Sequence, residues 1–303
     1  MAAPFTYQKI LILGVGLIGG SLALALKRRV AAGRIIGVGR TRTALEPARA
    51  LGVIDAAVGL DDSVALAEAV RGADLIVCAA PVAQTGPLLA RVAPWLEGET
   101  LLSDVGSTKA DAVEAAYQAL GAQAWRFVPA HPIAGRELSG VEAALADLYE
   151  QRQVVLCPLP DNPPAAVDRV EAMWLATGAR VLRMSALEHD AVLASVSHLP
   201  HVLAFALLEQ ILRAPDGARK LALAGSGFRD FTRLAAASPE MWRDICVANR
   251  AALLFDIDQF SAVLAELREH IAQGDGAALQ AVFERASSAR SAWGETRATG
   301  QDA

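Results

Sequence analysis

A glycine-rich turn near the N-terminus constrains the fold of this chain more than any other feature of the sequence. The aliphatic run Lys9–Leu13 leads directly into GVGLIG at 14–19, and an alanine-rich helical stretch over Ser21–Val30 follows. A strand, a G-x-G-x-x-G turn and a helix in this order are typical of a dinucleotide-binding βαβ unit. Its glycines permit a tight turn, a close backbone approach to a pyrophosphate, and close packing of helix on strand. We expect the helix N-terminus to face a dinucleotide, with contacts from Gly14, Gly16, Leu17, Ile18 and Gly19.

Strand patterns continue to alternate with helical stretches through the first half of the chain. Further strands are expected at Arg34–Val38, Leu75–Ala79, Thr100–Asp104, Arg126–Pro129 and Val154–Cys157. Helices are expected between them, at Ser63–Val70 and Ala110–Leu120. This alternation predicts a mostly parallel sheet. Helix Ala165–Ala176 and strand Arg180–Arg183 add one more sheet unit, so the sequence predicts an α/β domain of Rossmann type over residues 1–184.

The remaining residues, 185–303, show helical patterns and no convincing strand. One long helix is expected over Glu188–Arg213, with a kink at Pro200, and a second over Pro239–Gln273 with Ser238 as N-cap. Apolar residues of the second helix recur at spacings of 3 and 4, a pattern suited to helix packing: Ile257, Phe260, Leu264, Leu267 and Ile271. A second subunit or another helix of the chain would satisfy this stripe. The sequence predicts an all-α second domain.

Composition excludes several classes of partner. The 303 residues carry a formal net charge of −5, which argues against a surface that neutralises nucleic-acid phosphates or anionic lipid. The sequence has no run near the about 18 uninterrupted apolar residues of a membrane-spanning helix. No signal peptide is expected at the N-terminus, so a cytoplasmic location is the default. The three cysteines are widely separated in apolar settings, which indicates neither disulfides nor a metal site.

The end of the second strand predicts which dinucleotide is bound. An NAD-preferring site needs a carboxylate there to bind the ribose 2′-hydroxyl. The sequence instead reads Arg40-Thr41-Arg42 after Val38-Gly39, and two arginines with a threonine can bind a 2′-phosphate. We expect NADP to be preferred; the alternative is that the arginines are solvated loop charges and NAD is accepted. Pro81, which follows the strand at Leu75–Ala79, is added to the expected cofactor contacts.

Three further segments carry groups suited to chemistry: SDVGSTK at 103–109, HPIAG at 131–135 and SHLPH at 197–201. The first two follow predicted strands. Ligands of open α/β sheets bind beyond the carboxyl ends of the strands, so Ser107 and His131 fall where a nicotinamide ring and a substrate would meet. A small-molecule substrate is therefore the expected partner.

Taken together, these segments resemble the prephenate and arogenate dehydrogenase family of tyrosine biosynthesis. The resemblance extends over nearly the whole chain through GVGLIGGSLA, DVGSTK, HPIAG, EHD at 188–190, SHLPH, GFRDFTR at 227–233 and SPEMWRDI. It implies an N-terminal dinucleotide-binding domain, a helical dimerisation domain, and oxidative decarboxylation of a cyclohexadienyl substrate with NAD or NADP. It also implies a homodimer, with tyrosine as a candidate inhibitor acting through the active site or the dimer interface.

The resemblance also assigns roles to individual residues. It makes His131 the catalytic histidine, which takes the proton of the substrate's ring hydroxyl, and an imidazole is well matched to that role. Ser107 would orient His131 and contact the nicotinamide. Arg233 matches the arginine that binds a substrate carboxylate, for which a guanidinium fork is suited.

Four more residues are expected on the substrate side. Ser197 and His201 lie four apart on a helix and so share one face, and His198 lies between them. Buried structural roles are the alternative for these three. Glu137 matches a position near the mouth of the site, although an exposed loop carboxylate fits the sequence nearly as well.

Two other functions compete with this interpretation. A two-domain dehydrogenase of the β-hydroxyacid type would need a catalytic lysine on a helix, and the C-terminal half contains only Lys220. A non-catalytic dinucleotide sensor could share the fold, but it would have no reason to keep Ser107, His131 and Arg233 together. The choice between prephenate and arogenate stays open, since they differ only in a side-chain keto or amino group.

Overall fold

The computed structural model describes residues 7–29, 31–136 and 138–298. The chain divides into two compact units, one ending at Leu253 and the other beginning at Leu254. The first unit contains both sheets and the site described below. The second consists of helices.

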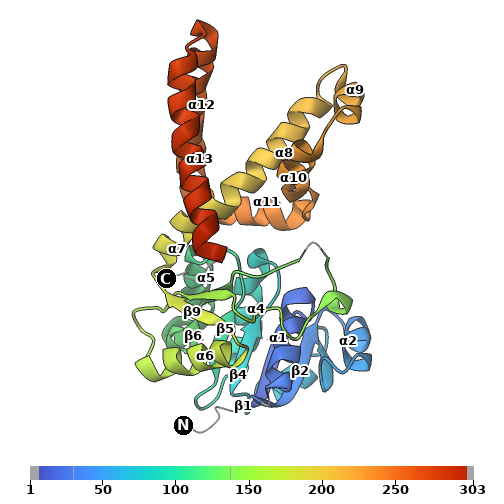
Figure 1. The fold of residues 1–303 in the computed structure, drawn as a ribbon. Helices are drawn as coiled ribbons and strands as arrows, with labels where there is room; N and C mark the ends of the chain where they lie inside the picture. Colours follow the sequence, from blue (N-terminus) through green and yellow to red (C-terminus); the bar gives the residue numbers. More distant parts are fainter. Residues whose placement is uncertain (1–6, 30, 137, 299–303) are drawn as a thin grey trace. The chain divides into compact units, whose positions relative to one another are not determined.

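A six-stranded parallel sheet forms the centre of the first unit (Figure 1). Its strands are β1 (Tyr7–Leu13), β2 (Ala32–Gly39), β3 (Ala56–Gly59), β4 (Leu75–Cys78), β5 (Leu101–Asp104) and β6 (Phe127–Val128). Their order is β3-β2-β1-β4-β5-β6, and each neighbouring pair is parallel. The chain reverses direction across the sheet between β1 and β4, which is where doubly wound folds bind their ligands.

Helices cover both faces of this sheet. The aliphatic side chains of β1 alternate, so Ile10 and Ile12 belong to one core and Leu11 and Leu13 to the other. The first core is closed by α1 (Leu17–Arg28) and α6 (Pro164–Ala176), and the second by α3 (Ser63–Val70), α4 (Thr85–Val92) and α5 (Ala110–Leu120). The short helix α2 (Glu46–Ala50) follows β2. The Rossmann-type α/β fold predicted from the sequence is confirmed.

A second, three-stranded sheet lies beside the first. It contains β7 (Ala130–Pro132), β8 (Gln153–Leu156) and β9 (Arg180–Arg183), with β7 antiparallel and β9 parallel to β8. The prediction that the last strands extend one mostly parallel sheet is therefore corrected. Strand β7, which carries His131, was not predicted.

The rest of the first unit is helical: α7 (Ala186–Leu193), a π-helical turn (Ala194–His198), α8 (Leu199–Leu212), α9 (Gly217–Ala222), α10 (Ser226–Thr232) and α11 (Pro239–Ala248). The helix predicted over Glu188–Arg213 is thus interrupted by a π-turn just before Pro200, the kind of local adjustment that accompanies an insertion into the helical ladder. By length and composition, the run Ala186–Leu212 could cross a membrane. Only 22% of its apolar window is buried, and its first turns contact the α/β part through His189 and Asp190.

Two long helices, α12 (Arg250–Gln273) and α13 (Gly276–Ala298), contribute nearly all of the second unit. The helix predicted over Pro239–Gln273 is therefore divided at Asn249, which ends α11. Gly274, with φ of +68°, permits the turn between α12 and α13. Several large apolar side chains of this unit are exposed, including Phe255, Phe260, Leu264, Ile271 and Phe283.

Candidate active site

The glycine-rich turn lies at the carboxyl end of β1. Gly14 has a φ of +101°, and its amide donates to the Val38 carbonyl at 2.8 Å, which ties the turn to β2. A Cβ on Gly19 would lie 2.2 Å from the Gly14 carbonyl oxygen, whereas a Cβ on Gly16 would meet no atom within 4 Å. Gly16 is also the N-cap of α1. The turn is therefore packed tightly on its inner side and open at Gly16, which fits a dinucleotide whose pyrophosphate lies against Gly16 and the helix N-terminus.

The residues expected to select the cofactor lie at the same edge of the sheet. Arg40, Thr41 and Arg42 directly follow β2 and are exposed, and the Thr41 hydroxyl accepts from the Ala44 amide at 3.3 Å. Pro81 is also exposed, after β4, at the start of a turn over Val82–Gln84 that contacts α11. The structure thus gathers the expected cofactor contacts along the carboxyl ends of β1, β2 and β4.

A buried ion pair joins the next strand end to β7. The Lys109 side chain is fully buried, and its Nζ donates to Asp104 Oδ2 and, at 2.9 Å, to the Ala130 carbonyl. Asp104 also accepts from the amides of Gly106 and Ala130, both at 2.9 Å. Because these bonds satisfy both buried charges, they offset the cost of desolvation. They fix the residue that precedes His131 against the end of β5.

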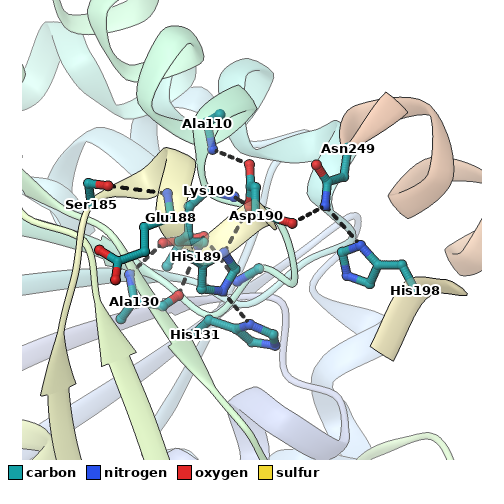
Figure 2. Close-up of polar contacts among 12 residues, drawn as sticks. Lys109, Ala110, Ala130, His131, Ser185, Glu188, His189, Asp190, His198 and Asn249 are labelled. Carbon is teal, nitrogen blue, oxygen red and sulfur yellow. Dashed lines mark hydrogen bonds and ion pairs between the residues drawn. The ribbon is translucent and has the colours of Figure 1, made fainter. Parts of the chain in front are cut away.

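His131 is held by a chain of side chains from α7 (Figure 2). Its Nδ1 lies 2.8 Å from His189 Nε2, and His189 Nδ1 lies 2.8 Å from Asp190 Oδ1. The Asp190 carboxylate also accepts from the backbone amides of Lys109 and Ala110, each at 2.8 Å. These two amides belong to the first turn of α5, so the chain ends on the positive end of a helix dipole.

The environment keeps His131 uncharged. Burial lowers its pKa well below the ordinary 6.5, and the neighbouring His189, Lys109 and His198 lower it further. Burial alone would raise the pKa of Asp190, but the bonds from His189, Ala110 and Lys109 outweigh it, so that pKa is lowered. A neutral imidazole is thus linked through two hydrogen bonds to a fixed carboxylate, an arrangement suited to general base catalysis.

Asn249 connects this chain to His198. Its Nδ2 donates to the Asp190 carbonyl at 2.8 Å and to His198 Nδ1 at 3.0 Å. The neutral His198 ring therefore carries its proton on Nε2. Burial lowers the pKa of His198 to about 4, although Asp190 partly opposes this effect. His198 is buried, so its expected role on the substrate side stays a prediction beside the structural role it has here.

His201, Ser197 and Arg233 form a second group. His201 stacks on Trp242 with ring centroids 3.6 Å apart, and its Nδ1 donates to the Ser197 carbonyl at 2.8 Å. Burial lowers the pKa of His201, the bond to Ser197 opposes this, and Arg233 lowers it further. Arg233 is exposed at the end of α10, next to a turn that packs on α8. The structure therefore brings the predicted carboxylate-binding arginine close to His201.

The geometry differs from the sequence-based expectation at one contact. Among the described residues, His189 rather than Ser107 is hydrogen-bonded to His131 Nδ1. Ser107 is half-buried in the loop between β5 and α5, and its expected contact with the nicotinamide stays a prediction. Glu137 lies outside the described residues. No group of three or more His, Cys, Asp or Glu side chains in the described part of the chain could hold a metal ion.

Sequence reasoning missed His189, Asn249 and the structural role of Lys109. The segment EHD was noticed as part of a resemblance, but His189 by itself gave no functional signal. The contact that reveals it joins residues 58 apart in the chain. Asn249 was hidden inside a helical pattern that the sequence predicts to be continuous.

A parallel sheet ordered 3-2-1-4-5-6 with an open glycine turn after β1 is typical of a nucleotide-binding α/β protein, and the histidine–carboxylate chain near the end of β5 adds a candidate base. Residues 22–183 match the family profile described as prephenate dehydrogenase, nucleotide-binding domain. Residues 185–285 match the profile described as prephenate dehydrogenase, dimerization domain. The chain belongs to the prephenate dehydrogenase family.

Named relatives agree with this assignment. The chain is 36% identical to a prephenate dehydrogenase of Bacillus subtilis, over 93% of this chain and 75% of that protein. It is 35% identical to a cyclohexadienyl dehydrogenase of Zymomonas mobilis, over 94% and 95% of the two chains. The structure of A. aeolicus prephenate dehydrogenase in complex with hydroxyphenyl propionate and NAD+ superposes with a TM-score of 0.88 at 33% identity, covering 95% of this chain and 99% of that one.

Proposed function

We propose that this chain catalyses the oxidative decarboxylation of a cyclohexadienyl substrate, prephenate or arogenate, using NADP in preference to NAD. The relatives named above are prephenate and cyclohexadienyl dehydrogenases, and a Synechocystis arogenate dehydrogenase has the same fold, with a TM-score of 0.77 at 29% identity over 94% of this chain and all of that one. The observation that carries the proposal is the neutral His131, held by His189 and fixed beside the carboxyl end of β5 through the bond from the Ala130 amide to Asp104.

His131 acts as the base in this reaction. The ring hydroxyl of the substrate must lose its proton as its carbon is oxidised, and Nε2 is the ring nitrogen of His131 that His189 leaves available. When bound, the nicotinamide accepts the hydride from that carbon. Loss of carbon dioxide then follows as the ring becomes aromatic, and it needs no further acid or base from the protein.

A cation at the site is proposed to hold one of the substrate carboxylates. Arg233 is the proposed partner of one carboxylate, because a guanidinium binds such a group with two parallel hydrogen bonds. His201 and Ser197 lie near it and are proposed to complete the substrate side. Arg233→Ala should raise KM for the substrate by tenfold or more, about 1.4 kcal/mol of binding, while the Kd of the dinucleotide stays the same.

The dinucleotide is proposed to bind along Gly14–Gly19 with its 2′-phosphate near Arg40 and Arg42. These arginines are exposed, and residues 40–42, which directly follow β2, include no carboxylate that could bind a free 2′-hydroxyl, which supports this preference. Arg42→Ala should raise KM for NADP and leave KM for NAD nearly unchanged. The matched control is Arg71→Ala. Arg71 is exposed before β4 and lies near the start of β1, at the amino ends of the strands and away from the proposed dinucleotide site.

The decisive assay follows reduced nicotinamide with prephenate and arogenate, each paired with NADP and NAD. Turnover in any pairing supports the reaction, and the best pairing identifies the preferred substrate and cofactor. His131→Asn should lower kcat by about 10²- to 10⁴-fold, the usual contribution of a general base, with dinucleotide binding retained. Absence of turnover in all four pairings, with dinucleotide binding demonstrated, would overturn the proposal and favour a non-catalytic sensor.

A reaction of the β-hydroxyacid type is not favoured. A 3-hydroxyisobutyrate dehydrogenase shares the fold with a TM-score of 0.55 at 16% identity. Such enzymes need a free catalytic lysine. Lys220 instead pairs with Asp216 at the surface at 2.8 Å, and Lys109 is buried against Asp104.

The remaining proposals concern the assembly and its setting. The dimerization-domain match and the exposed apolar side chains of α12 and α13 support a homodimer through the helical part, with a domain boundary at 184/185. A cytoplasmic location and inhibition by tyrosine are proposed with it. Sedimentation would measure the dimer. Competition between tyrosine and substrate would support inhibition through the active site, whereas noncompetitive inhibition would favour the dimer interface.

A further inference from the structure

We infer that His189 and Asp190 are positioning residues that decide which ring nitrogen of His131 carries a proton, so that Nε2 is presented to the substrate as a base. The inference rests on the proposed function, because it concerns the same base. It assigns a role to two side chains of α7 that do not themselves react. The tautomer of His131 then follows from a fixed chain of donors and acceptors.

The chain begins at Asp190. Its carboxylate accepts from the Lys109 and Ala110 amides and lies 2.8 Å from His189 Nδ1. Backbone amides can only donate, and the first turn of α5 favours a negative charge, so Asp190 is an ionised acceptor. An ionised carboxylate has no proton to give. His189 must therefore carry its proton on Nδ1 and donate it to Asp190.

The next step sets the proton of His131. A neutral His189 with a proton on Nδ1 has a lone pair on Nε2. His131 Nδ1 lies 2.8 Å from this lone pair and must donate to it. The Nε2 of the neutral His131 then has a lone pair of its own. If His189 carried a proton on Nε2 instead, His131 would present an N–H to the substrate and could not accept a proton.

The charges around His131 favour the first pattern. The cation Lys109 lies close enough to lower the pKa of His131, and it is buried in an ion pair with Asp104. A proton on His189 Nε2 as well would direct a second positive group at His131, whereas a proton on Nδ1 alone faces the Asp190 carboxylate.

The same arrangement stabilises the product of proton transfer. The substrate O–H bond breaks and an Nε2–H bond forms, which leaves His131 as an imidazolium. Its Nδ1–H already points at the His189 lone pair, and the Asp190 carboxylate lies behind His189. No proton needs to move along the chain, and the carboxylate orients and stabilises the imidazolium as in the serine protease triad.

The tautomer can be measured without substrate. The chain has five histidines, so ring ¹⁵N shifts of ¹⁵N-histidine-labelled protein are readable, and loss of signals in His131→Gln assigns the ring. The expected spectrum has a protonated Nδ1 and an unprotonated Nε2 on His131. In the wild type, Asp190 Oδ1 accepts from the Lys109 amide and lies against His189 Nδ1, while Oδ2 accepts from the Ala110 amide. The amide of Asp190→Asn cannot replace both oxygens, so His189 is no longer held in one tautomer, and His131 protonated on Nε2 should appear in the spectrum.

Kinetics supply the second measurement. Asp190→Asn should lower kcat by about 10²- to 10⁴-fold, because the corresponding acid-to-amide change in the serine protease triad costs on the order of 10⁴. KM and the Kd for NADP should change by less than threefold. The matched control is Asp111→Asn, which makes the same chemical change in the first turn of α5 at a residue that makes no contact with His189 in the described structure.

A pair of variants at His189 covers the case in which Asp190→Asn fails to fold. His189→Gln keeps an amide oxygen that can accept from His131 and should retain more activity than His189→Leu, which keeps none. Equal kcat in these two variants, or a wild-type His131 protonated on Nε2, would overturn the inference. If the wild type turns over neither substrate, the proposed function fails, and the ¹⁵N spectrum still decides the tautomer.

Discussion

Replacing each of two glycines of the first turn by alanine should have a different effect: one substitution should lower stability, and the other should weaken dinucleotide binding. At Gly19, the added Cβ would lie 2.2 Å from the Gly14 carbonyl oxygen and 2.9 Å from side-chain carbons of both Ala79 and Ile12. Ordinary contacts between carbon atoms lie at about 3.5–4.0 Å, so α1 would have to move by roughly 1 Å. Overpacking of this kind costs about 1–3 kcal/mol. Gly19→Ala should therefore lower the free energy of unfolding by that amount.

Gly16→Ala is the matched control for folding. A Cβ there meets no protein atom within 4 Å, and φ is −100°, which alanine tolerates. The unfolded state loses some entropy on gaining a Cβ, and the N-cap position favours glycine over alanine; each effect is under about 1 kcal/mol. We expect these opposed effects to leave the free energy of unfolding within about 1 kcal/mol of the wild type. The Kd for NADP should nevertheless rise tenfold or more, because the methyl group occupies the side of the turn left open for the pyrophosphate.

Urea unfolding without cofactor and fluorescence titration with NADP and NAD separate the two effects. Equal stabilities of the two variants would refute the packing argument at Gly19. An unchanged Kd in Gly16→Ala would refute the placement of the dinucleotide at this turn. The two conclusions are independent, because one rests on contacts inside the protein and the other on space outside it.

Three further substitutions test the buried polar groups. Lys109→Met should lower the free energy of unfolding by about 3–5 kcal/mol in a urea titration, because it leaves Asp104 buried without a counter-ion. In the folded protein the pKa of His198 is about 4, against an ordinary 6.5, so below pH 6.5 the unfolded state binds this proton more readily. The free energy of unfolding should therefore fall by about 3 kcal/mol through this group as the pH drops toward 4. His198→Gln should reduce this pH dependence in thermal melts between pH 7 and 4. Tyr149→Phe removes the 2.6 Å bond to the Ile18 carbonyl and should cost about 1–2 kcal/mol, and an unchanged urea midpoint would count against this bond.

The central sheet could be predicted because its information is local. Helices Ser63–Val70 and Ala110–Leu120 lie where the sequence predicts them, and strands β1, β2, β4 and β5 lie within two residues of their predicted bounds. Apolar runs bounded by glycines specify such elements without reference to the rest of the chain. The prediction fails at β3, a short strand of small residues at the edge of the sheet.

The elements that complete the site depend on distant contacts. Strand β7 contains three residues, one of them a proline, and exists because it pairs with β8 and because Asp104 binds its first amide. Asn249 ends α11 while its side chain binds the Asp190 carbonyl and His198. Such contacts override local propensity, and no periodicity in the sequence reports them. The candidate residues were therefore found as separate motifs, while their connections were not.

Lys109 shows why those connections matter for function. Its side chain binds the carbonyl of Ala130, the residue before His131, while its backbone amide binds Asp190, the partner of His189. One residue thus fixes both the strand that carries the base and the carboxylate that orients it. Apolar residues could fill the same space at lower desolvation cost, so the buried charges are better explained by geometry than by stability. Loss of the Lys109 side chain should therefore impair His131 through Ala130 even if the Asp190 contact survives, because the second contact uses only the backbone.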